Sequence, residues 1–206
     1  MGDIGLVAGI LAGVLSFAEY PPYILAILGC DIFCRRIQQE NDYTKPSRAT
    51  WFILSFVNVL ILASWLDSGV HNPIWYVGGQ ALGCFVTGVL TFKYGARWTL
   101  WDGVCLFGAF ITILLWVYYA SAEVALYASI VVDFLALTPT IIKSWDHPEW
   151  ENRLSWDIAL LASTINLLAV ERWDLISAYL YPVYIAALNG IIVWVLRRKR
   201  KTVSTP

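Results

Sequence analysis

The run LISAYLYPVYIAALNGIIVWVL, residues 175–196, contains no Asp, Glu, Lys or Arg. A transmembrane helix needs about 20 predominantly apolar residues, because that length crosses the hydrocarbon core of a bilayer. Residues 49–66 and 68–92 are also free of charged side chains. Three such runs in a chain of 206 residues predict an all-α fold and a polytopic membrane protein.

The composition also favours a membrane protein over a soluble domain. Charged residues make up 14% of the chain and hydrophobic residues 59%, whereas a soluble domain has about 25% charged residues. The N-terminal segment MGDIGLVAGI has an acid and no basic residue, so we expect a permanent helix there rather than a cleaved signal peptide. The net charge of −1 does not by itself indicate a class of partner. We expect contact with the lipid bilayer and none with nucleic acid.

Seven segments are apolar enough to be transmembrane helices. They run approximately over residues 4–29, 49–66, 70–92, 98–119, 124–143, 154–170 and 174–196. The connections are short except for residues 31–48, DIFCRRIQQENDYTKPSR, which we interpret as a surface loop or a helix extension into the headgroups. We therefore expect a single membrane domain and no soluble domain.

Basic residues predict the orientation of the chain. Of the 14 Lys and Arg residues, all but Arg172 fall on one side of the predicted membrane. Cytoplasmic loops carry an excess of Lys and Arg, so we expect the N-terminus outside and the C-terminus in the cytoplasm. The tail RRKRK then anchors this topology in a cell membrane.

The two halves of the chain share a pattern at a spacing of 108 residues. The pairs at this spacing are Ser47 and Ser155, Asn58 and Asn166, and Trp65 and Trp173. The first helix of each half also contains a proline late in its length, Pro22 or Pro139. The pattern predicts two parallel three-helix repeats joined by a linker helix and followed by a basic tail. The expected boundaries of these four parts are 1–95, 96–122, 123–197 and 198–206.

This order of three, one and three helices, with Pro22 and Pro139 in the first helix of each triplet, resembles the SWEET and PQ-loop repeat transporter superfamily. Tyr23 and Thr140 stand where the PQ-loop signature has Gln. The chain is most similar to bacterial multi-pass members of unassigned function, and the nicotinamide riboside transporter family has a related architecture. The resemblance implies a carrier with pocket-lining polar side chains on the third helix of each triplet.

Two acids lie inside predicted membrane helices, each ahead of a proline. Glu19 stands three residues before Pro22, and Asp133 stands six residues before Pro139. Such an acid faces the bundle interior or an aqueous cavity, since inserting it into lipid costs about 2.5–3.5 kcal/mol. A proline frees the carbonyl four residues earlier, so a nearby carboxylate can bind a cation, a hydroxyl, an amine or a proton. We expect both acids to bind substrate and both prolines to act as hinges. The alternative is a protonated acid in an interhelical hydrogen bond.

Six further residues are candidates for substrate contacts. They are Asn58, Asn166, Gln80, Asn189, Trp51 and Trp156. The four amides lie near helix centres, where interhelical hydrogen bonding is the alternative role. The two tryptophans can stack on a ring-shaped substrate or belong to the aromatic belt at the membrane surface. Gly79 and Gly83 lie four residues apart and predict a close-packing helix face.

Motifs for catalysis are absent from the sequence. His71 and His147 are isolated, and the four cysteines are typical of small packing residues. The segment DHPEWEN, residues 146–152, has side chains that can bind a metal in an enzyme, but we favour a solvated interfacial loop. We therefore expect no enzyme activity, no metal and no cofactor.

These features predict an integral membrane carrier that moves a small polar solute by alternating access between two three-helix bundles. Proton coupling and homo-oligomerisation stay open. The alternatives are a non-transporting membrane receptor or assembly factor with the same fold, or a vitamin- or nucleoside-type importer. A carrier requires that Glu19, Asp133, Gln80 and Asn189 converge on one cavity.

Overall fold

The structure is a computed structural model that describes residues 2–29, 48–94, 100–119 and 121–198. Within these ranges the chain is all-helical and contains no strand. The helices are α1 (Gly2–Ala18), α2 (Tyr20–Ile27), α3 (Arg48–Asp67), α4 (Ile74–Tyr94), α5 (Leu100–Tyr119), α6 (Ala122–Asp146), α7 (Arg153–Leu168) and α8 (Ile176–Arg197), with a 3₁₀ turn, η2 (Pro148–Trp150), before α7. Each predicted segment corresponds to one helix, except that the first is divided into α1 and α2.

Among the described residues, five helical stretches are long and apolar enough to cross a membrane. They are Ile4–Ile27, Thr50–Asp67, Ile74–Tyr94, Glu123–Asp146 and Ile176–Arg197. Helix α5 has a shorter apolar stretch, Leu106–Leu115, and α7 has 16 residues. The all-α prediction is confirmed, and the apolar helices suggest a multi-pass membrane protein. Seven membrane crossings stay a prediction.

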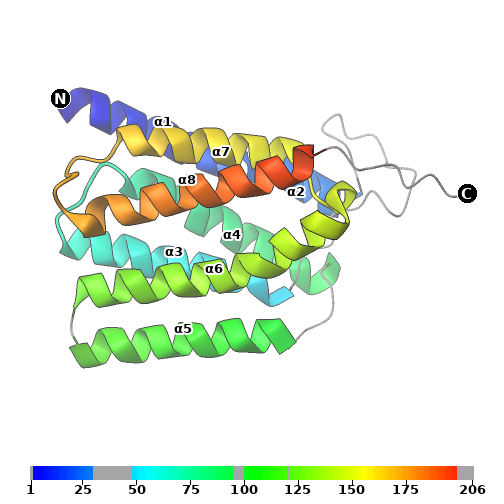
Figure 1. The fold of residues 1–206 in the computed structure, drawn as a ribbon, viewed down its shortest axis with the longest axis horizontal. Coiled ribbons are helices and arrows are strands. Elements are labelled where there is room, and N and C mark those ends of the chain that lie inside the picture. Colours follow the sequence, from blue (N-terminus) through cyan, green and yellow to red (C-terminus); the bar gives the residue numbers. More distant parts are fainter. Residues whose placement is uncertain (1, 30–47, 95–99, 120, 199–206) are drawn as a thin grey trace, which may run out of the picture.

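The helices lie side by side along the long axis of the bundle (Figure 1). In the first half of the chain, α4 packs against both α1 and α3; in the second half, α8 packs against both α6 and α7. The halves meet where α1 packs on α7 and where α3 packs on α6. Helix α5 packs against α6 and α3 at the edge of the bundle.

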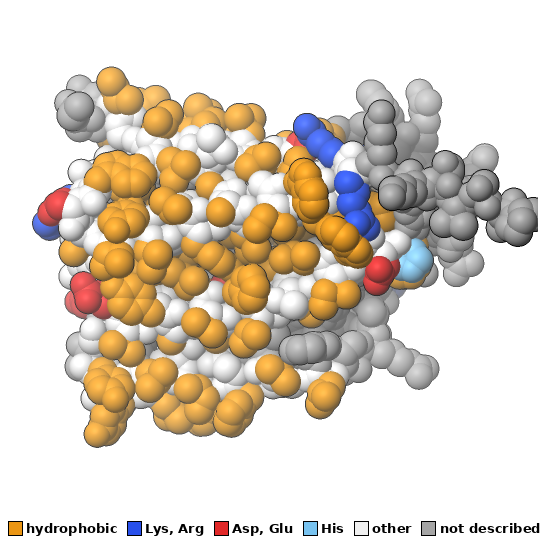
Figure 2. Space-filling view, in the orientation of Figure 1, with side chains coloured by type: hydrophobic (Ala, Val, Ile, Leu, Met, Phe, Trp, Pro, Cys, Tyr) orange, Lys and Arg blue, Asp and Glu red, His pale blue; other side chains and the backbone are white. Residues whose placement is uncertain are grey.

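Hydrophobic side chains cover the visible side of the bundle, and charged side chains gather at its two ends (Figure 2). Lys93 and Arg197 stand at helix termini at one end, and Arg172 stands in the connection at the other. Large apolar side chains point outward along the sides: Phe92 is 67% exposed and Phe107 is 66% exposed. Soluble monomers rarely expose extensive apolar patches, so this surface suits a lipid environment.

Glu19 interrupts the first span between α1 and α2. Its amide donates to the Leu15 carbonyl at 3.1 Å, so the chain is still helical up to this point. Pro21 and Pro22 then have no amide hydrogen, which leaves the carbonyls four residues earlier without their helical donors. Pro139, by contrast, lies inside the continuous helix α6. The two expected bend points therefore differ in form.

Gly79 and Gly83 on α4 approach the first span so closely that no side chain fits. A Cβ atom at Gly79 would collide with Ser16 Oγ, and one at Gly83 would collide with the Tyr20 ring. Ser16 Oγ donates to the Tyr76 carbonyl at 2.9 Å in the same contact. The two glycines thus form the close-packing face that their spacing predicted.

Several predictions concern residues that the structure does not describe. The expected surface loop at 31–48 lies, apart from its last residue, outside the described residues. Ser47 of the matched pairs, the cysteines at 30 and 34, and the basic tail from residue 199 onward lie outside them as well. These expectations stay predictions.

Candidate functional site

A cavity of about 40 Å³ with several polar lining residues lies inside the bundle. Its walls come from the junction of α1 and α2 and from α3, α4, α6, α7 and α8. Its polar and aromatic lining residues are Glu19, Tyr20, Trp51, Asn58, Gln80, Cys84, Asp133, Trp156, Tyr181 and Asn189. Seven of the eight predicted substrate contacts are among them, and only Asn166 is elsewhere.

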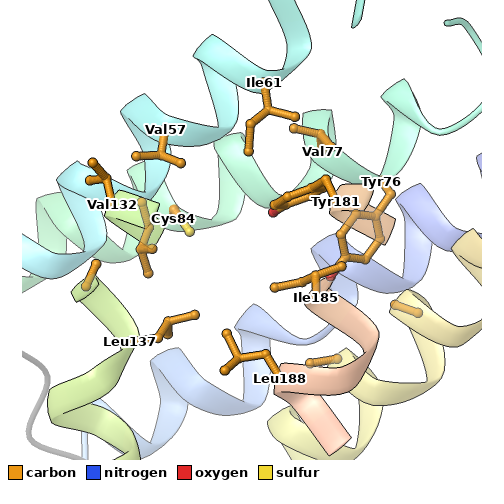
Figure 3. Close-up of a cluster of buried hydrophobic side chains, with 14 of the residues drawn as sticks. Val57, Ile61, Tyr76, Val77, Cys84, Val132, Leu137, Tyr181, Ile185 and Leu188 are labelled. Carbon is orange, nitrogen blue, oxygen red and sulfur yellow. The ribbon is translucent and has the colours of Figure 1, made fainter. Parts of the chain in front are cut away.

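Apolar side chains complete the wall of the cavity (Figure 3). Leu137 on α6 and Ile185 on α8 surround the same space as Cys84 on α4, with the Tyr181 ring beside them. The cavity is therefore a polar site in an apolar frame. Electrostatic interactions are stronger in such low-dielectric surroundings than in water.

Glu19 is held at the helix break by a side chain of α4. Gln80 Nε2 donates to Glu19 Oε1 at 3.0 Å and lies 3.1 Å from the Tyr76 hydroxyl, while the Tyr20 hydroxyl donates to Gln80 Oε1. The second carboxylate oxygen, Glu19 Oε2, is buried and has no hydrogen-bond partner among the described residues. Leaving such an atom unpaired is unfavourable, so a ligand or a water molecule that reaches Oε2 is stabilised there.

Asp133 on α6 supplies the second carboxylate of the cavity and is 2% exposed. The Tyr184 hydroxyl of α8 donates to Asp133 Oδ2 at 2.8 Å. Glu19, Asp133, Gln80 and Asn189 all line the one cavity, as a carrier requires. Their role in binding a substrate stays a prediction.

Two of the predicted amides both line the cavity and link helices. Asn58 Oδ1 accepts from the Tyr181 hydroxyl at 3.1 Å, and Asn58 Nδ2 donates to the Leu54 carbonyl at 2.8 Å. Asn189 Nδ2 donates to Ser163 Oγ at 3.2 Å. The two roles considered from the sequence, interhelical bonding and a place in the pocket, therefore coexist in these residues.

Asn166, the repeat partner of Asn58, lies apart from the cavity. It is fully buried on α7, and neither side-chain Nδ2 nor Oδ1 has a hydrogen-bond partner among the described residues. The matched spacing therefore does not bring it to the other seven candidates. Asn58 reaches the cavity from α3 through its contact with Tyr181, and no corresponding contact positions Asn166.

At the end that holds the α2 C-terminus, aromatic rings separate the cavity from the surface. A second cavity of about 20 Å³ shares four lining residues with the first and adds Tyr23, Ser155 and Ala159. The shared residues are Glu19, Tyr20, Trp51 and Trp156. The ring centroids of Tyr23 and Trp51 lie 4.9 Å apart. Trp156 is 8% exposed and points inward, so the aromatic-belt alternative is wrong for this residue.

At the opposite end of the bundle, Trp65 packs between α3 and α8. This residue is fully buried, and its ring centroid lies 5.8 Å from that of Tyr181 in an edge-on arrangement. Its Nε1 donates to the Ser177 carbonyl at 2.9 Å, which links α3 to the start of α8. Trp65 therefore packs behind Tyr181, which lines the cavity.

The second part of the segment 146–152 packs onto the bundle. The expectation of a solvated loop is therefore wrong for Glu151 and Asn152. Glu151 is 5% exposed and accepts from Trp156 Nε1 at 3.0 Å. Asn152 Oδ1 caps α7 by accepting from the Ser155 amide at 3.0 Å. Asn152 Nδ2 donates to the Pro22 carbonyl at 3.2 Å and thereby ties α7 to α2.

Two acids outside the cavity belong to surface ion pairs. Asp157 pairs with Arg197 at 2.7 Å, which ties α7 to the end of α8. Asp174 pairs with Arg172 at 2.8 Å in the connection between α7 and α8. The hydrogen bond from this guanidinium lowers the pKa of the Asp174 carboxyl below its usual range.

Sequence reasoning missed the tyrosines of the site. They are Tyr20, Tyr76, Tyr181 and Tyr184. Their helical spacing was a usable signal, because residues four apart share a helix face. Tyr76, Gln80 and Cys84 repeat at that interval on α4, as do Tyr181, Ile185 and Asn189 on α8.

No protein-family model, curated protein or solved structure matches the chain. Among the described residues, no three His, Cys, Asp or Glu side chains group in a way that could hold a metal ion. The chemistry of the site therefore follows from its own geometry: two buried carboxyl groups, amides and aromatic rings around a small space.

Proposed function

We propose that the protein is an integral membrane carrier that moves a small polar solute through the cavity between its two halves. The observation that carries this proposal is the shared cavity itself. Glu19 and Gln80 of the first half and Asp133 and Asn189 of the second half line it together. Polar and ionisable groups at membrane depth are costly, and they typically mark a solute or ion pathway.

The packing of the helices supports two parallel three-helix repeats. In each triplet the third helix, α4 or α8, lies against both of the others. Across the interface, the first helix of each triplet packs on the second helix of the other, α1 on α7 and α6 on α3. Two equivalent contacts of this kind are what a two-fold relation between repeats produces. Helix α5 then serves as the linker, as in the SWEET and PQ-loop arrangement.

The small size of the cavity supports alternating access. A space of about 40 Å³ holds a few water molecules, since one needs roughly 10–15 Å³. A solute therefore enters only when the halves move apart at one end. The helix break before Pro22 and the missing hydrogen bond at Pro139 are suitable hinges. In the predicted orientation, the end with Tyr23 and Ser155 faces the cytoplasm.

Solute flux into liposomes that contain the purified chain tests this proposal. The carrier should move at least one solute from a panel of labelled amines, sugars and nucleosides, with and without a pH gradient. Glu19→Gln and Asp133→Asn should each abolish the flux or its pH dependence, whereas Asp157→Asn, at a surface pair, should retain both. Absence of flux for the whole panel contradicts the carrier and favours a receptor or assembly factor.

A further inference from the structure

The cavity contains two carboxyl groups and no basic group among its described lining residues. Glu19 and Asp133 both line it, and its lining residues include no Lys, Arg or His among the part of the chain that the structure describes. Their hydrogen-bond partners, Gln80 and Tyr184, are neutral. A buried carboxylate is stabilised by a positive charge nearby, and here a solute is the natural source of that charge.

Glu19 Oε2 marks the position for the solute. The other oxygen, Oε1, accepts from Gln80, but Oε2 is buried without a hydrogen-bond partner among the described residues. Glu19 lines both the main cavity and the smaller one that adjoins Ser155. Glu19 therefore lies where the two spaces meet.

Aromatic rings surround the same position. Tyr20, Trp51 and Trp156 line both cavities together with Glu19. The ring centroids of Tyr20 and Trp51 lie 6.0 Å apart in an edge-on arrangement. A cation over the face of such rings is attracted by their quadrupole, and groups of rings recognise quaternary ammonium ions in this way.

We propose that the cavity binds a small organic ammonium ion, with its charged group against Glu19 and within the rings of Tyr20, Trp51 and Trp156. This inference rests on the proposed carrier function and names the class of its solute. A hard metal ion such as Ca²⁺ takes six to eight oxygen ligands, whereas the rings here favour an alkylated cation. An anion would meet two carboxylates and no basic side chain.

The direct test compares two solutes of one shape. Choline and 3,3-dimethyl-1-butanol differ in the replacement of the ammonium nitrogen by carbon, so only choline is charged. Titration calorimetry on the purified full-length chain in detergent should show that choline binds more tightly by about tenfold or more. Equal affinity for the two solutes overturns the inference, and so does binding of Na⁺ or K⁺ with no binding of choline.

Variants locate the bound charge. Glu19→Gln should reduce the preference for choline by about tenfold, whereas Asp157→Asn should leave it unchanged. Glu19→Asp retains the charge and should recover part of the preference. If Glu19→Gln does not fold, Trp51→Leu removes one ring and should weaken choline binding while leaving the binding of the neutral alcohol unaltered. An unchanged preference in folded Glu19→Gln or in folded Trp51→Leu contradicts the assignment.

Failure of the inference and failure of the carrier can be told apart. If liposomes with the protein move neutral solutes but neither bind nor move choline, the carrier stands and the ammonium assignment is wrong. If choline binds with the expected preference but no solute crosses, the assignment stands and the carrier is wrong.

Discussion

Gln80 Nε2 donates a 3.0 Å hydrogen bond to Glu19 Oε1, which joins the middle of α4 to the break in the first span. This bond uses one oxygen of the buried carboxyl group and leaves the other without a hydrogen-bond partner among the described residues. It also stabilises an acid that stands close to two prolines. The break exposes the side chain to a cavity, and the amide from α4 stabilises it there.

Replacement of Gln80 by Leu should destabilise the protein and disable the site. A hydrogen bond to a charged group contributes about 1.5–3 kcal/mol, so the free energy of unfolding should fall by an amount in that range. Choline binding should weaken as well, because Glu19 loses its orientation. Tyr76→Phe is the control, since it removes the other partner of the Gln80 amide and keeps the bond to Glu19. An equal loss in both variants would show that the Glu19 bond has no special role.

Substitution of Gly79 by Ala should reduce stability, and the same change at Gly78 should not. A Cβ at Gly79 meets Ser16 and the Gly13 backbone, whereas one at Gly78 has no neighbour within 4 Å. Overpacking costs about 1–3 kcal/mol, but Gly→Ala in an open helical position gains about 0.5–1 kcal/mol. Thermal unfolding in detergent measures both. Similar midpoints for the two variants would contradict the close contact of α1 with α4.

The positions of the helices can be predicted from the sequence, because runs without charged residues define where each helix begins and ends. The predicted segments at 49–66 and 174–196 correspond closely to α3, Arg48–Asp67, and α8, Ile176–Arg197. The position of Glu19 and Asp133 inside the bundle also follows from the sequence, since inserting either acid into lipid is costly. Such an argument depends only on the residue type and on its position along a membrane helix. It does not require knowledge of the residues that pack against it.

The remaining features depend on pairs of residues from distant parts of the chain. Trp65 meets Ser177 and Asp157 meets Arg197 only after the helices have packed. Asn166 shows what the repeat pattern cannot predict. Asn58 and Asn166 have matching positions in the two halves, but only Asn58 lines the cavity. The tyrosines were overlooked since their hydroxyls find partners on other helices.

Tyr184→Phe should impair the site through Asp133. The hydroxyl is the hydrogen-bond donor to Asp133 Oδ2, and its removal leaves a buried acceptor unpaired at a cost of about 1–3 kcal/mol. Solute binding should weaken by about tenfold if that carboxylate contributes. Tyr179→Phe is the matched control on the same helix, because Tyr179 stacks on Trp173 at the end of the bundle. Binding that is equal in both variants would remove Asp133 from the site.

Asn152→Asp should open the end of the cavity near Ser155 without loss of the helix cap. Aspartate still accepts from the Ser155 amide, but it cannot donate to the Pro22 carbonyl as Asn152 Nδ2 does. The link between α7 and α2 is therefore lost. Alkylation of the cavity cysteine, Cys84, followed by peptide mass spectrometry, should proceed several-fold faster. Asn152→Ala should show the same rate increase and, in addition, lose about 1 kcal/mol of stability with the cap. An unchanged rate in Asn152→Asp would mean that this bond does not hold the end closed.

Counterflow is the most direct test of a solute site that is open to one side at a time. Liposomes containing the full-length chain are loaded with unlabelled solute, and entry of the labelled solute is followed over time. The carrier predicts a transient accumulation above equilibrium that Glu19→Gln and Asp133→Asn abolish and Asp157→Asn preserves. Simple equilibration, or no entry for any amine, sugar or nucleoside, would contradict a carrier with its site between the two halves.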